Sequence, residues 1–493
     1  MVTRFPDIPQ LSGFNAPLRV EADIYDLEVS QGEIPPQLDG TYYRIVCDRQ
    51  FPSFVQGDIP FNADGMATSF RFKAGHVDYK SRYVRTPRFN AERAARRALF
   101  GAYRNPFTDD PSVTGMVRGV ANTNLYWHAG KLLALKEDSP PIRIDPDTLE
   151  TIGEYTYDGA LTGQTFTAHP KLDPRTGEMV CFGFAAKGET TPDIVYYEMD
   201  RDGRVIHETW FQAPYPSMVH DFAVTQNFVV FPVIPLTSDM ERLKTGQPHF
   251  GWDPDKDVFL GVLPRKGTGR QVRWYRGSNR FASHIMGAYD DGRYLHIDTP
   301  VAQSNYFPWF PDLSGAPYDP ERAKGHLSRW TIDTAADPGA GGHGTDGGDD
   351  FTETRLTDCS GEFPRMDDRY ETLPYHWGVL ALNHVPDDER PGMGFRWLGA
   401  VDLDRRRTTT RWAGPDSCFY EPLFVPARPD AAEGEGYVMA IVGRYAEMRS
   451  DLLILDAQRL DAPPVATVKL PIRLPYGLHG NWLDASELAQ RAD

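Results

Sequence analysis

Cysteine is scarce in this sequence of 493 residues, and the cysteines present are too far apart to form CxxC pairs. The four cysteines are Cys47, Cys181, Cys359 and Cys418. Closely spaced histidines of the HxxxH kind, a common zinc signature, are absent as well. We therefore expect reduced, buried thiols in an intracellular protein rather than a disulfide framework. Any metal site has to collect its ligands from distant parts of the chain.

Long apolar runs and an excess of basic charge are also lacking. The longest apolar stretch, 228–236, is broken by two prolines and falls short of the roughly 18–20 residues that span a bilayer. The first ten residues lack the apolar core of a signal peptide. The 52 lysines and arginines against 69 aspartates and glutamates give a net charge of −17, which argues against a nucleic-acid or anionic-membrane partner. We expect a cytoplasmic protein without integral membrane association, and the sequence does not indicate its oligomeric state.

What the chain does contain is a recurring pattern of short strands separated by tight polar turns. Tyr, Phe, Val, Ile and Trp dominate the strands, and Gly, Asp, Asn and Pro bound them. The predicted hairpins lie at 69–86, 124–137, 194–211, 284–300, 395–414 and 436–457. Such hairpins, without long helices between them, predict an all-β fold of radially repeated sheets, a propeller. No strict repeat motif is visible, so a WD40-type array is not expected.

One domain covering residues 1–493 is expected, because the hairpins continue on both sides of the single low-complexity run. That run, 335–350, predicts a surface loop in which His343 is solvated.

One segment, 89–106, departs from the strand pattern and predicts a helix that covers one face of the sheets. Asn90 is the expected N-cap and Pro106 the expected end. Spacing at i, i+4 defines one helical face. The residues of that face are Ala91, Ala95, Leu99 and Tyr103.

Four of the 13 histidines have distinctive surroundings. His169 precedes a proline and a turn, His220 and His284 stand at strand starts, and His479 lies between two glycines. Widely spaced histidines at strand starts suit a propeller, whose inner strand ends converge on one axis. Four neutral imidazoles would hold Fe(II) and leave positions open for oxygen. Hydrogen-bonded structural histidines remain the alternative for each position.

Several motifs together resemble a known family over nearly the whole chain. They are GTYYRI (40–45), FNADGMATSFRF (61–72), NLYWHAGKLLALKEDSPP (124–141), TAHPKLDPRTGEM (167–179), MVHDFAVTQNFVVFP (218–232), GEFPRMDDRY (361–370), EPLFVP (421–426) and PYGLHGNW (475–482). The chain is similar to the carotenoid cleavage oxygenases, and most of all to their lignostilbene/stilbene dioxygenase branch. This resemblance implies a seven-bladed β-propeller with a helical and loop cap over an axial iron site. It also implies cleavage of a carbon–carbon double bond by O2 to two carbonyl products. The implied Fe(II) ligands are His169, His220, His284 and His479.

The resemblance further implies three carboxylates that accept the outer N–H groups of three of the four histidines. By motif these are Glu137, Glu362 and Glu421. A carboxylate in that place fixes the tautomer and orientation of the imidazole. Which histidine lacks such a partner stays open. Thr123 matches a position whose methyl group crowds the site opposite one histidine.

The substrate branch depends on Phe61, Tyr103 and Lys136. By resemblance, Lys136 and Tyr103 hydrogen-bond the 4-hydroxyl of a stilbene, and Phe61 packs on its ring. A desolvated ammonium favours the phenolate, which pushes electron density towards the double bond. Phe307 is a further expected substrate contact, and Phe310 a further aromatic wall, with core packing as the alternative. Neighbouring residues of a regular strand point to opposite faces, so the strand must end or bend for both Lys136 and Glu137 to serve the site.

Taken together, the sequence predicts an Fe(II)-dependent dioxygenase that needs no organic cofactor. Its expected reaction cleaves the central double bond of hydroxylated stilbenes, such as resveratrol or lignin-derived stilbenes, to two aromatic aldehydes. One alternative is an apocarotenoid cleavage oxygenase of the same fold. The other is a non-catalytic propeller that serves as a scaffold.

Overall fold

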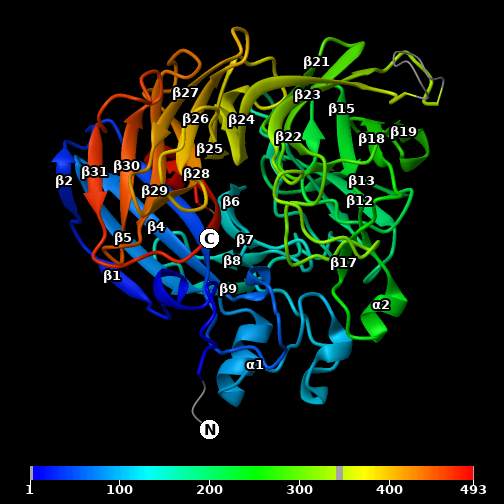
Figure 1. The fold of residues 1–493 in the computed structure, drawn as a ribbon, viewed down its shortest axis with the longest axis horizontal. Helices are drawn as coiled ribbons and strands as arrows, with labels where there is room; N and C mark the ends of the chain where they lie inside the picture. The colour runs from blue at the N-terminus through cyan, green and yellow to red at the C-terminus, as the bar shows by residue number, and fades with distance from the viewer. Residues whose placement is uncertain (1–3, 340–347, 492–493) are drawn as a thin grey trace.

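β-strands dominate the computed structural model, which describes residues 4–339 and 348–491 (Figure 1). In that part of the chain the α-helices are short: α1 (Pro87–Ala95), α2 (Met240–Lys244) and α3 (Ala485–Leu488). The expected all-β class is therefore confirmed. No helix among these residues has the length and apolar character needed to cross a membrane.

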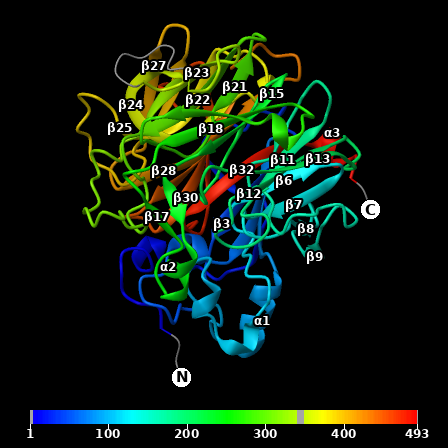
Figure 2. The same cartoon turned by 90° about the vertical axis from the view of Figure 1, so that its right-hand side faces the viewer.

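The strands form sheets that follow one another around the middle of the molecule (Figures 1 and 2). One five-stranded sheet contains β1 (Ala22–Ile24), β5 (His76–Tyr83), β4 (Gly65–Lys73), β3 (Gly40–Cys47) and β32 (Gly477–Asp484). Three four-stranded sheets follow in the chain. The first contains β6 (Asn124–His128), β7 (Lys131–Leu135), β8 (Ile142–Ile144) and β9 (Thr151–Glu154). The second contains β10 (Lys171–Leu172), β11 (Met179–Phe184), β12 (Asp193–Met199) and β13 (Val205–Gln212). The third contains β14 (Ala223–Val224), β15 (Phe228–Val233), β18 (Val258–Pro264) and β19 (Arg273–Gly277).

The remaining strands form a small ribbon and two large sheets. The ribbon pairs β16 (Leu236–Ser238) with β17 (Phe250–Trp252). The eight-stranded sheet contains β20 (Phe281–Ala282), β21 (Gly287–Asp290), β22 (Tyr294–Ala302), β23 (His326–Asp333), β24 (Thr352–Met366), β25 (Trp377–His384), β26 (Trp397–Asp402) and β27 (Arg407–Trp412). The second five-stranded sheet contains β28 (Ser417–Pro426), β29 (Gly436–Arg444), β30 (Arg449–Asp456), β31 (Ala466–Lys469) and β2 (Glu28–Gly32).

Two pairings tie the ends of the chain together. The last strand, β32, pairs with β3, and β31 pairs with β2. In both cases a strand from the last thirty residues or so joins one from the first fifty. This pairing holds the two ends of the chain together in the same sheets.

All six predicted hairpins are confirmed as antiparallel pairs, and their turns explain why these residues form them. Between β4 and β5, Ala74 and Gly75 both have positive φ, 51° and 81°. Ala129 and Gly130 repeat this between β6 and β7, with φ of 50° and 74°. Two consecutive positive φ values define the type I′ turn, whose twist matches that of the flanking strands.

The predicted helix 89–106 is wrong in its extent and in its buried face. The helix α1 begins after Thr86, whose side chain accepts the Phe89 N–H, and ends at Arg96, which has a left-handed φ of 56°. Pro87 at the first helical position fixes φ and needs no N–H partner there. Its buried residues are Arg88, Phe89 and Glu92.

The polar residues of α1 are buried because they have partners. The Glu92 carboxylate accepts the N–H groups of Leu99 and Phe100, and Arg88 donates to the side chain of Asn62. The predicted helical face therefore combined residues of α1 with residues that lie beyond its end. Leu99 and Tyr103 are buried in the irregular segment that follows α1, and Ala95 is exposed.

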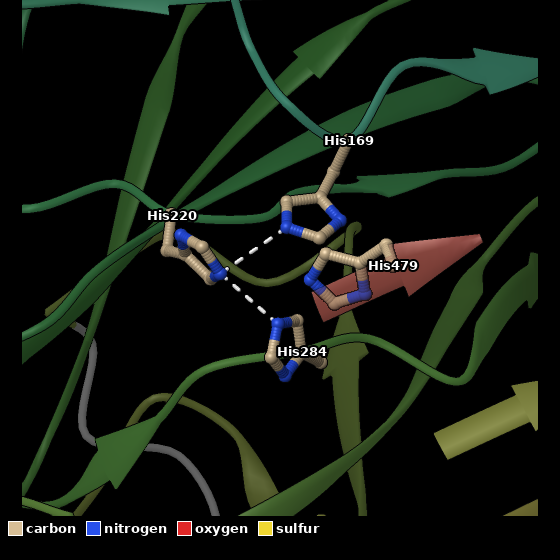
Figure 3. A group of neighbouring side chains, drawn as sticks. All are labelled: His169, His220, His284 and His479. Atoms are coloured by element: carbon tan, nitrogen blue, oxygen red, sulfur yellow. Dashed lines mark hydrogen bonds between the residues drawn. The ribbon is translucent and has the colours of Figure 1, made fainter. Parts of the chain in front are cut away.

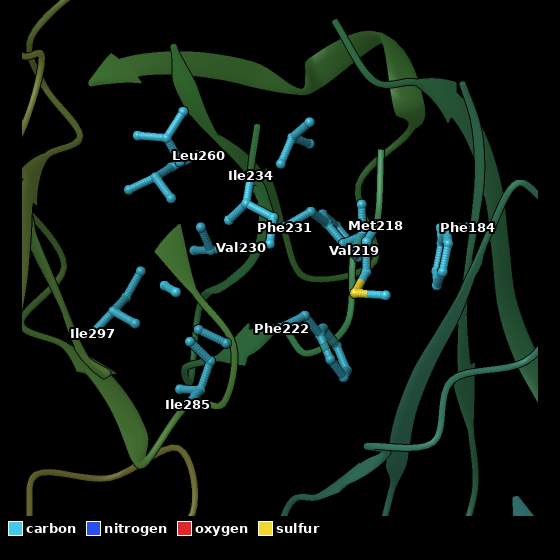
Figure 4. Close-up of a cluster of buried hydrophobic side chains, with 14 of the residues drawn as sticks. Phe184, Met218, Val219, Phe222, Val230, Phe231, Ile234, Leu260, Ile285 and Ile297 are labelled. Atoms are coloured by element: carbon cyan, nitrogen blue, oxygen red, sulfur yellow. The ribbon is translucent and has the colours of Figure 1, made fainter. Parts of the chain in front are cut away.

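Apolar side chains fill the space between neighbouring sheets. In the largest cluster, Phe184 on β11, Phe231 on β15, Leu260 on β18 and Ile297 on β22 come from three successive sheets (Figure 4). Of the predicted loop 335–350, residues 335–339 and 348–350 lie outside helices and strands, and the rest, with His343, lies outside the described residues.

Candidate metal centre

The four predicted histidines meet at one point in the interior (Figure 3). Their ligand nitrogens all lie within 4.8 Å of one another. His169 precedes β10, His220 precedes β14, His284 lies between β20 and β21, and His479 lies on β32. Each histidine thus lies on or directly beside a strand of a different sheet, in line with the convergence argument. Successive histidines are separated by up to 195 residues in the sequence, yet all four meet at one centre.

The contacts between the imidazoles fit a cation. His220 Nε2 lies 3.1 Å from His169 Nε2 and 3.0 Å from His284 Nε2 (Figure 3). The opposite ring nitrogens, His220 Nδ1 and His284 Nδ1, face carboxylates, so they carry the protons. The two Nε2 atoms then point lone pairs at each other, which is unfavourable without a positive charge between them. Metal–nitrogen bonds in proteins are about 2.0–2.1 Å long, so one cation could bind both nitrogens of such a pair.

Three buried carboxylates hold the outer nitrogens. Glu137 Oε1 lies 2.5 Å from His220 Nδ1, and Glu421 Oε1 lies 2.8 Å from His479 Nδ1. Glu362 Oε2 accepts from His284 Nδ1. Each imidazole is therefore fixed in the tautomer that presents Nε2 to the centre.

The charges of these groups suit a cationic centre. Burial opposes ionisation of the carboxylates, but Lys136 and His220 hold the pKa of Glu137 well below its usual range. His284 does the same for the pKa of Glu362 and His479 for that of Glu421, to a smaller extent. Burial and the neighbouring imidazoles lower the pKa of His169 well below its usual range. His169 is therefore neutral and free to act as a ligand.

Irregularities in the strands aim these side chains at the centre. Glu137 follows the end of β7 at Leu135, which resolves how it and Lys136 both face inwards. Glu421 lies where β28 has one extra residue relative to β29, between Phe419 and Pro422. A similar shift follows Glu362 on β24. A bulge redirects side chains that strict alternation would turn away.

A register shift of the same kind positions His479. The register between β3 and β32 shifts between the Arg44–Gly480 and Val46–Gly477 pairs, so β32 carries one extra residue there. The backbone N–H of His479 donates to the Thr123 carbonyl at 3.1 Å. Thr123 is buried, and its hydroxyl lies 3.2 Å from the Asn122 side chain. Its observed contact with the centre is therefore through the backbone.

His169 is the histidine without a carboxylate: in the described part of the chain its ring forms no ion pair with Asp or Glu, whereas the other three do. This answers the question that the motifs left open. A hydrogen bond from its backbone N–H to the Thr167 hydroxyl, 2.9 Å long, holds the loop instead.

The residues predicted to bind substrate form one group beside Glu137. The Lys136 ammonium lies 3.5 Å from Glu137 Oε2, 5.1 Å from the centre of the Tyr103 ring and 5.7 Å from that of Phe61. Phe61 and Phe307 meet edge to face at 5.5 Å. Phe310 contacts both Phe307 and Tyr103. We name Phe61, Tyr103, Phe307, Trp309 and Phe310 the aromatic group.

The sequence did not predict two aromatic residues, one in the aromatic group and one beside His284. Trp309 packs edge-on against Phe61 and stacks on Phe307, and its indole N–H is buried without an acceptor. Phe363 stacks on the His284 ring at 5.3 Å. The signal for Trp309 was its place within NYFPWF, two residues from Phe307. Phe363 adjoins Glu362, but no spacing in the sequence distinguishes it.

Four imidazoles that meet at one centre of a β-sheet protein, three of them backed by carboxylates, form a group with the donor set of a metal site. The sequence profile described as retinal pigment epithelial membrane protein (RPE65) matches residues 15–484. The chain belongs to this family, and the family predicted from the motifs, the carotenoid oxygenases, is confirmed.

Individual relatives agree over the full length. The chain is 46% identical to lignostilbene-alpha,beta-dioxygenase isozyme III of Sphingomonas paucimobilis, over 99% of either chain. It is 45% identical to isoeugenol monooxygenase of Pseudomonas putida, over 96% of this chain and 98% of that one. The crystal structure of Pseudomonas brassicacearum lignostilbene dioxygenase is similar with a TM-score of 0.93 and 42% identity, covering 98% of this chain and 100% of the other. The predicted class of enzyme, an oxygenase, is confirmed.

Proposed function

We propose that this protein is an Fe(II)-dependent dioxygenase that cleaves the central double bond of 4-hydroxystilbenes to two aromatic aldehydes. The observation that carries the proposal is one continuous arrangement of charged groups. Lys136 Nζ lies 3.5 Å from Glu137 Oε2, and Glu137 Oε1 lies 2.5 Å from a histidine of the centre. A phenol bound at the ammonium is thereby placed beside the metal centre.

Fe(II) fits the residues present. His169, His220, His284 and His479 would hold it through neutral imidazole nitrogens, a donor set suited to redox-active iron. The chemistry that the ion supplies when bound is activation of O2. The protein supplies a fixed set of imidazole orientations through Glu137, Glu362 and Glu421.

Lys136 and Tyr103 are proposed to bind the 4-hydroxyl of the substrate. Burial raises the pKa of Tyr103 to about 12, so its hydroxyl stays protonated at neutral pH. Burial opposes the charge on Lys136, but Tyr103 and Glu137 raise its pKa above the usual value, so it stays an ammonium. Two donors therefore face one oxygen, and they stabilise the phenolate over the phenol, whose pKa is ordinarily about 10.

The phenolate charge gives these contacts a role in the reaction as well as in substrate binding. Its electron density is conjugated with the central double bond, so ionisation enriches that bond in electrons before it meets oxygen. Phe61 and Phe307 would pack against the substrate rings and keep water from the phenolate. A low local dielectric strengthens the ammonium–phenolate attraction.

The proposal extends to the fold around the centre. In this proposal the long strand β24 joins two blades within the eight-stranded sheet. With the five sheets of four or five strands, these two make seven blades. The segment from α1 to Val113 carries Tyr103 and is proposed to act as a cap. A single domain and a cytoplasmic location are part of the same proposal.

The decisive experiment is an assay with resveratrol, O2 and added Fe(II). We expect two aldehydes, activity that is lost with a metal chelator, and no cleavage of the analogue in which the 4-hydroxyl is methylated. Equal cleavage of the methylated analogue would contradict the role of Lys136 and Tyr103. Absence of stoichiometric iron, or an unchanged iron content in His220→Ala, would contradict the centre and favour the scaffold alternative. Cleavage of apocarotenals but not stilbenes would favour the other alternative.

A second substrate class is supported by the isoeugenol monooxygenase relative, which is as similar as the lignostilbene enzyme. A propenylphenol also carries a phenolic hydroxyl conjugated to a double bond, so Lys136 and Tyr103 could bind it in the same way. Comparing kcat/KM for resveratrol and isoeugenol with one preparation separates the two. The stilbene proposal requires the larger value for resveratrol.

A further inference from the structure

A polar cavity reaches the four-histidine centre on the side away from the aromatic group. Its volume is about 490 Å³, and His169, His284 and His479 all line it. His220 does not line it, and neither do Glu137, Lys136 or the aromatic group. The aromatic group therefore lies outside this cavity, and any approach past that group would be a separate one. We name this cavity the polar cavity.

Carboxylates dominate the walls of the polar cavity. Seven carboxylates and three cationic side chains line it, apart from the histidines. The carboxylates belong to Asp221, Asp367, Asp368, Glu371, Glu421, Asp484 and Glu487, and the cations to Lys171, Arg365 and Arg369. Walls of low dielectric focus such a field and concentrate counter-ions of the opposite sign.

The three cations are held by carboxylates. Lys171 Nζ lies 3.0 Å from Asp221 Oδ1, Arg369 pairs with Asp367, and Arg365 lies 3.2 Å from Asp368 Oδ2 and 3.5 Å from Glu421 Oε1. Glu371, Asp484 and Glu487 take part in none of the ion pairs found among the described residues, but Asp484 and Glu487 cap α3, whereas Glu371 is half-buried in the wall. Glu371 is therefore the lining carboxylate that is held neither by a cation nor by a helix cap.

We propose that the polar cavity is the route by which the divalent metal ion reaches the histidines, with Glu371 as its transient ligand on the way. The inference rests on the proposed metal centre. Two independent observations support it: the acidic lining, and the ring nitrogens of His169 and His284 at its inner end, which lie 3.1 and 3.0 Å from His220 Nε2.

An approach past the aromatic group would repel such an ion. On the side of His220, the Lys136 ammonium stands among aromatic rings, only 3.5 Å from the carboxylate behind that histidine. A hydrated dication would have to approach a like charge in an apolar setting, where repulsion is strong. The same setting suits a planar, uncharged aromatic substrate. Charge thus assigns the metal to the polar cavity and the organic substrate to the aromatic group.

Metal uptake by the chelated, metal-free protein tests the route without reference to activity. The probe is Co(II) alone, followed by its visible absorption and by final metal content. Burial raises the pKa of Glu371 to about 7, so uptake is measured at pH 8. At low ionic strength we expect Glu371→Gln to slow uptake about threefold and Glu371→Lys about tenfold, in the range of electrostatic steering effects. Both effects should vanish at high salt, and the final stoichiometry should not change.

Two control variants distinguish entry through the polar cavity from a general effect of charge and from entry past Lys136. Glu241→Gln on α2 removes the same charge from an exposed site outside the cavity and should load at the wild-type rate. Lys136→Met should not accelerate uptake, because the ion does not pass that side. Unchanged uptake in both Glu371 variants at low salt, or faster uptake in Lys136→Met, would overturn the route. A protein that binds no metal at all would instead overturn the proposed centre itself.

Discussion

At the residue scale, Glu137 links Lys136, the proposed substrate contact, to His220, a histidine of the proposed metal centre. One of its oxygens faces the His220 imidazole and the other the Lys136 ammonium. Removing either partner leaves a buried carboxylate with less compensation, which is costly. The two neighbours Lys136 and Glu137 therefore have separable roles that variants can distinguish.

Replacement of Lys136 by Met tests the phenolate role. The change removes a charge-assisted hydrogen bond worth about 1.5–3 kcal/mol, so kcat/KM for a 4-hydroxystilbene should fall at least about tenfold. Iron content should stay stoichiometric, since no metal ligand changes. Steady-state kinetics and metal analysis together check this.

Lys131→Met is the matched control, because Lys131 lies at the start of the strand that Lys136 follows and packs on the Tyr155 ring instead. It should keep the wild-type kcat/KM. Equal losses in both variants would indicate a general effect on the sheet.

Glu421→Gln tests the carboxylates that hold the imidazoles. The amide keeps the shape but weakens the acceptor for His479 Nδ1–H, and loss of such partners typically lowers metal affinity about 10–100-fold. Competition with a chelator of known affinity measures the change. Glu435→Gln, which alters an exposed ion pair with Arg428, should leave affinity unaltered.

At the element scale, regular structure could be predicted and its interruptions could not. The hairpins were predicted because alternation and turn residues are local signals, as with Ala74-Gly75. The four histidines were predicted because strand starts converge. The bulge at Glu421 and the early end of α1 at Arg96 depend on tertiary partners, which no local pattern reveals. The resemblance named Glu421, but only the structure explains how a strand residue reaches His479.

The strand that carries His479 offers a test of how tightly the ligand is positioned. A Cβ at Gly477 would lie 2.2 Å from Nη2 of the fully buried Arg44. Gly477→Ala must therefore shift β32 or the guanidinium, and overpacking of this kind costs about 1–3 kcal/mol. Denaturant unfolding should show this loss, together with weaker metal binding.

The double variant Arg44→Leu/Gly477→Ala separates the clash from other effects. If the contact with Arg44 is the cause, the double variant should lose less stability than the sum of the two single variants. Strict additivity would contradict this explanation.

At the scale of the whole molecule, the proposed metal centre lies where four sheets that are distant in sequence meet. His169 and His220 directly precede strands of the second and third four-stranded sheets, His284 lies between two strands of the eight-stranded sheet, and His479 lies on the sheet that pairs the two ends of the chain. Without a cation, the facing imidazole nitrogens repel one another at the middle of the molecule. Metal binding should therefore stabilise the arrangement of sheets as well as the site.

Chelation should accordingly lower the stability of the whole fold. A ligand that binds only the native state stabilises it by about 2.7 kcal/mol at one hundred times its dissociation constant. Thermal unfolding with and without chelator should show a clear drop in the midpoint, restored by added Fe(II) under anaerobic conditions. In His220→Ala, which lacks the imidazole closest to two others, the shift on adding metal should shrink. A midpoint that is the same with metal and with chelator in the wild-type protein would mean that the sheets hold the histidines together unaided, and that the centre contributes to chemistry but not to the fold.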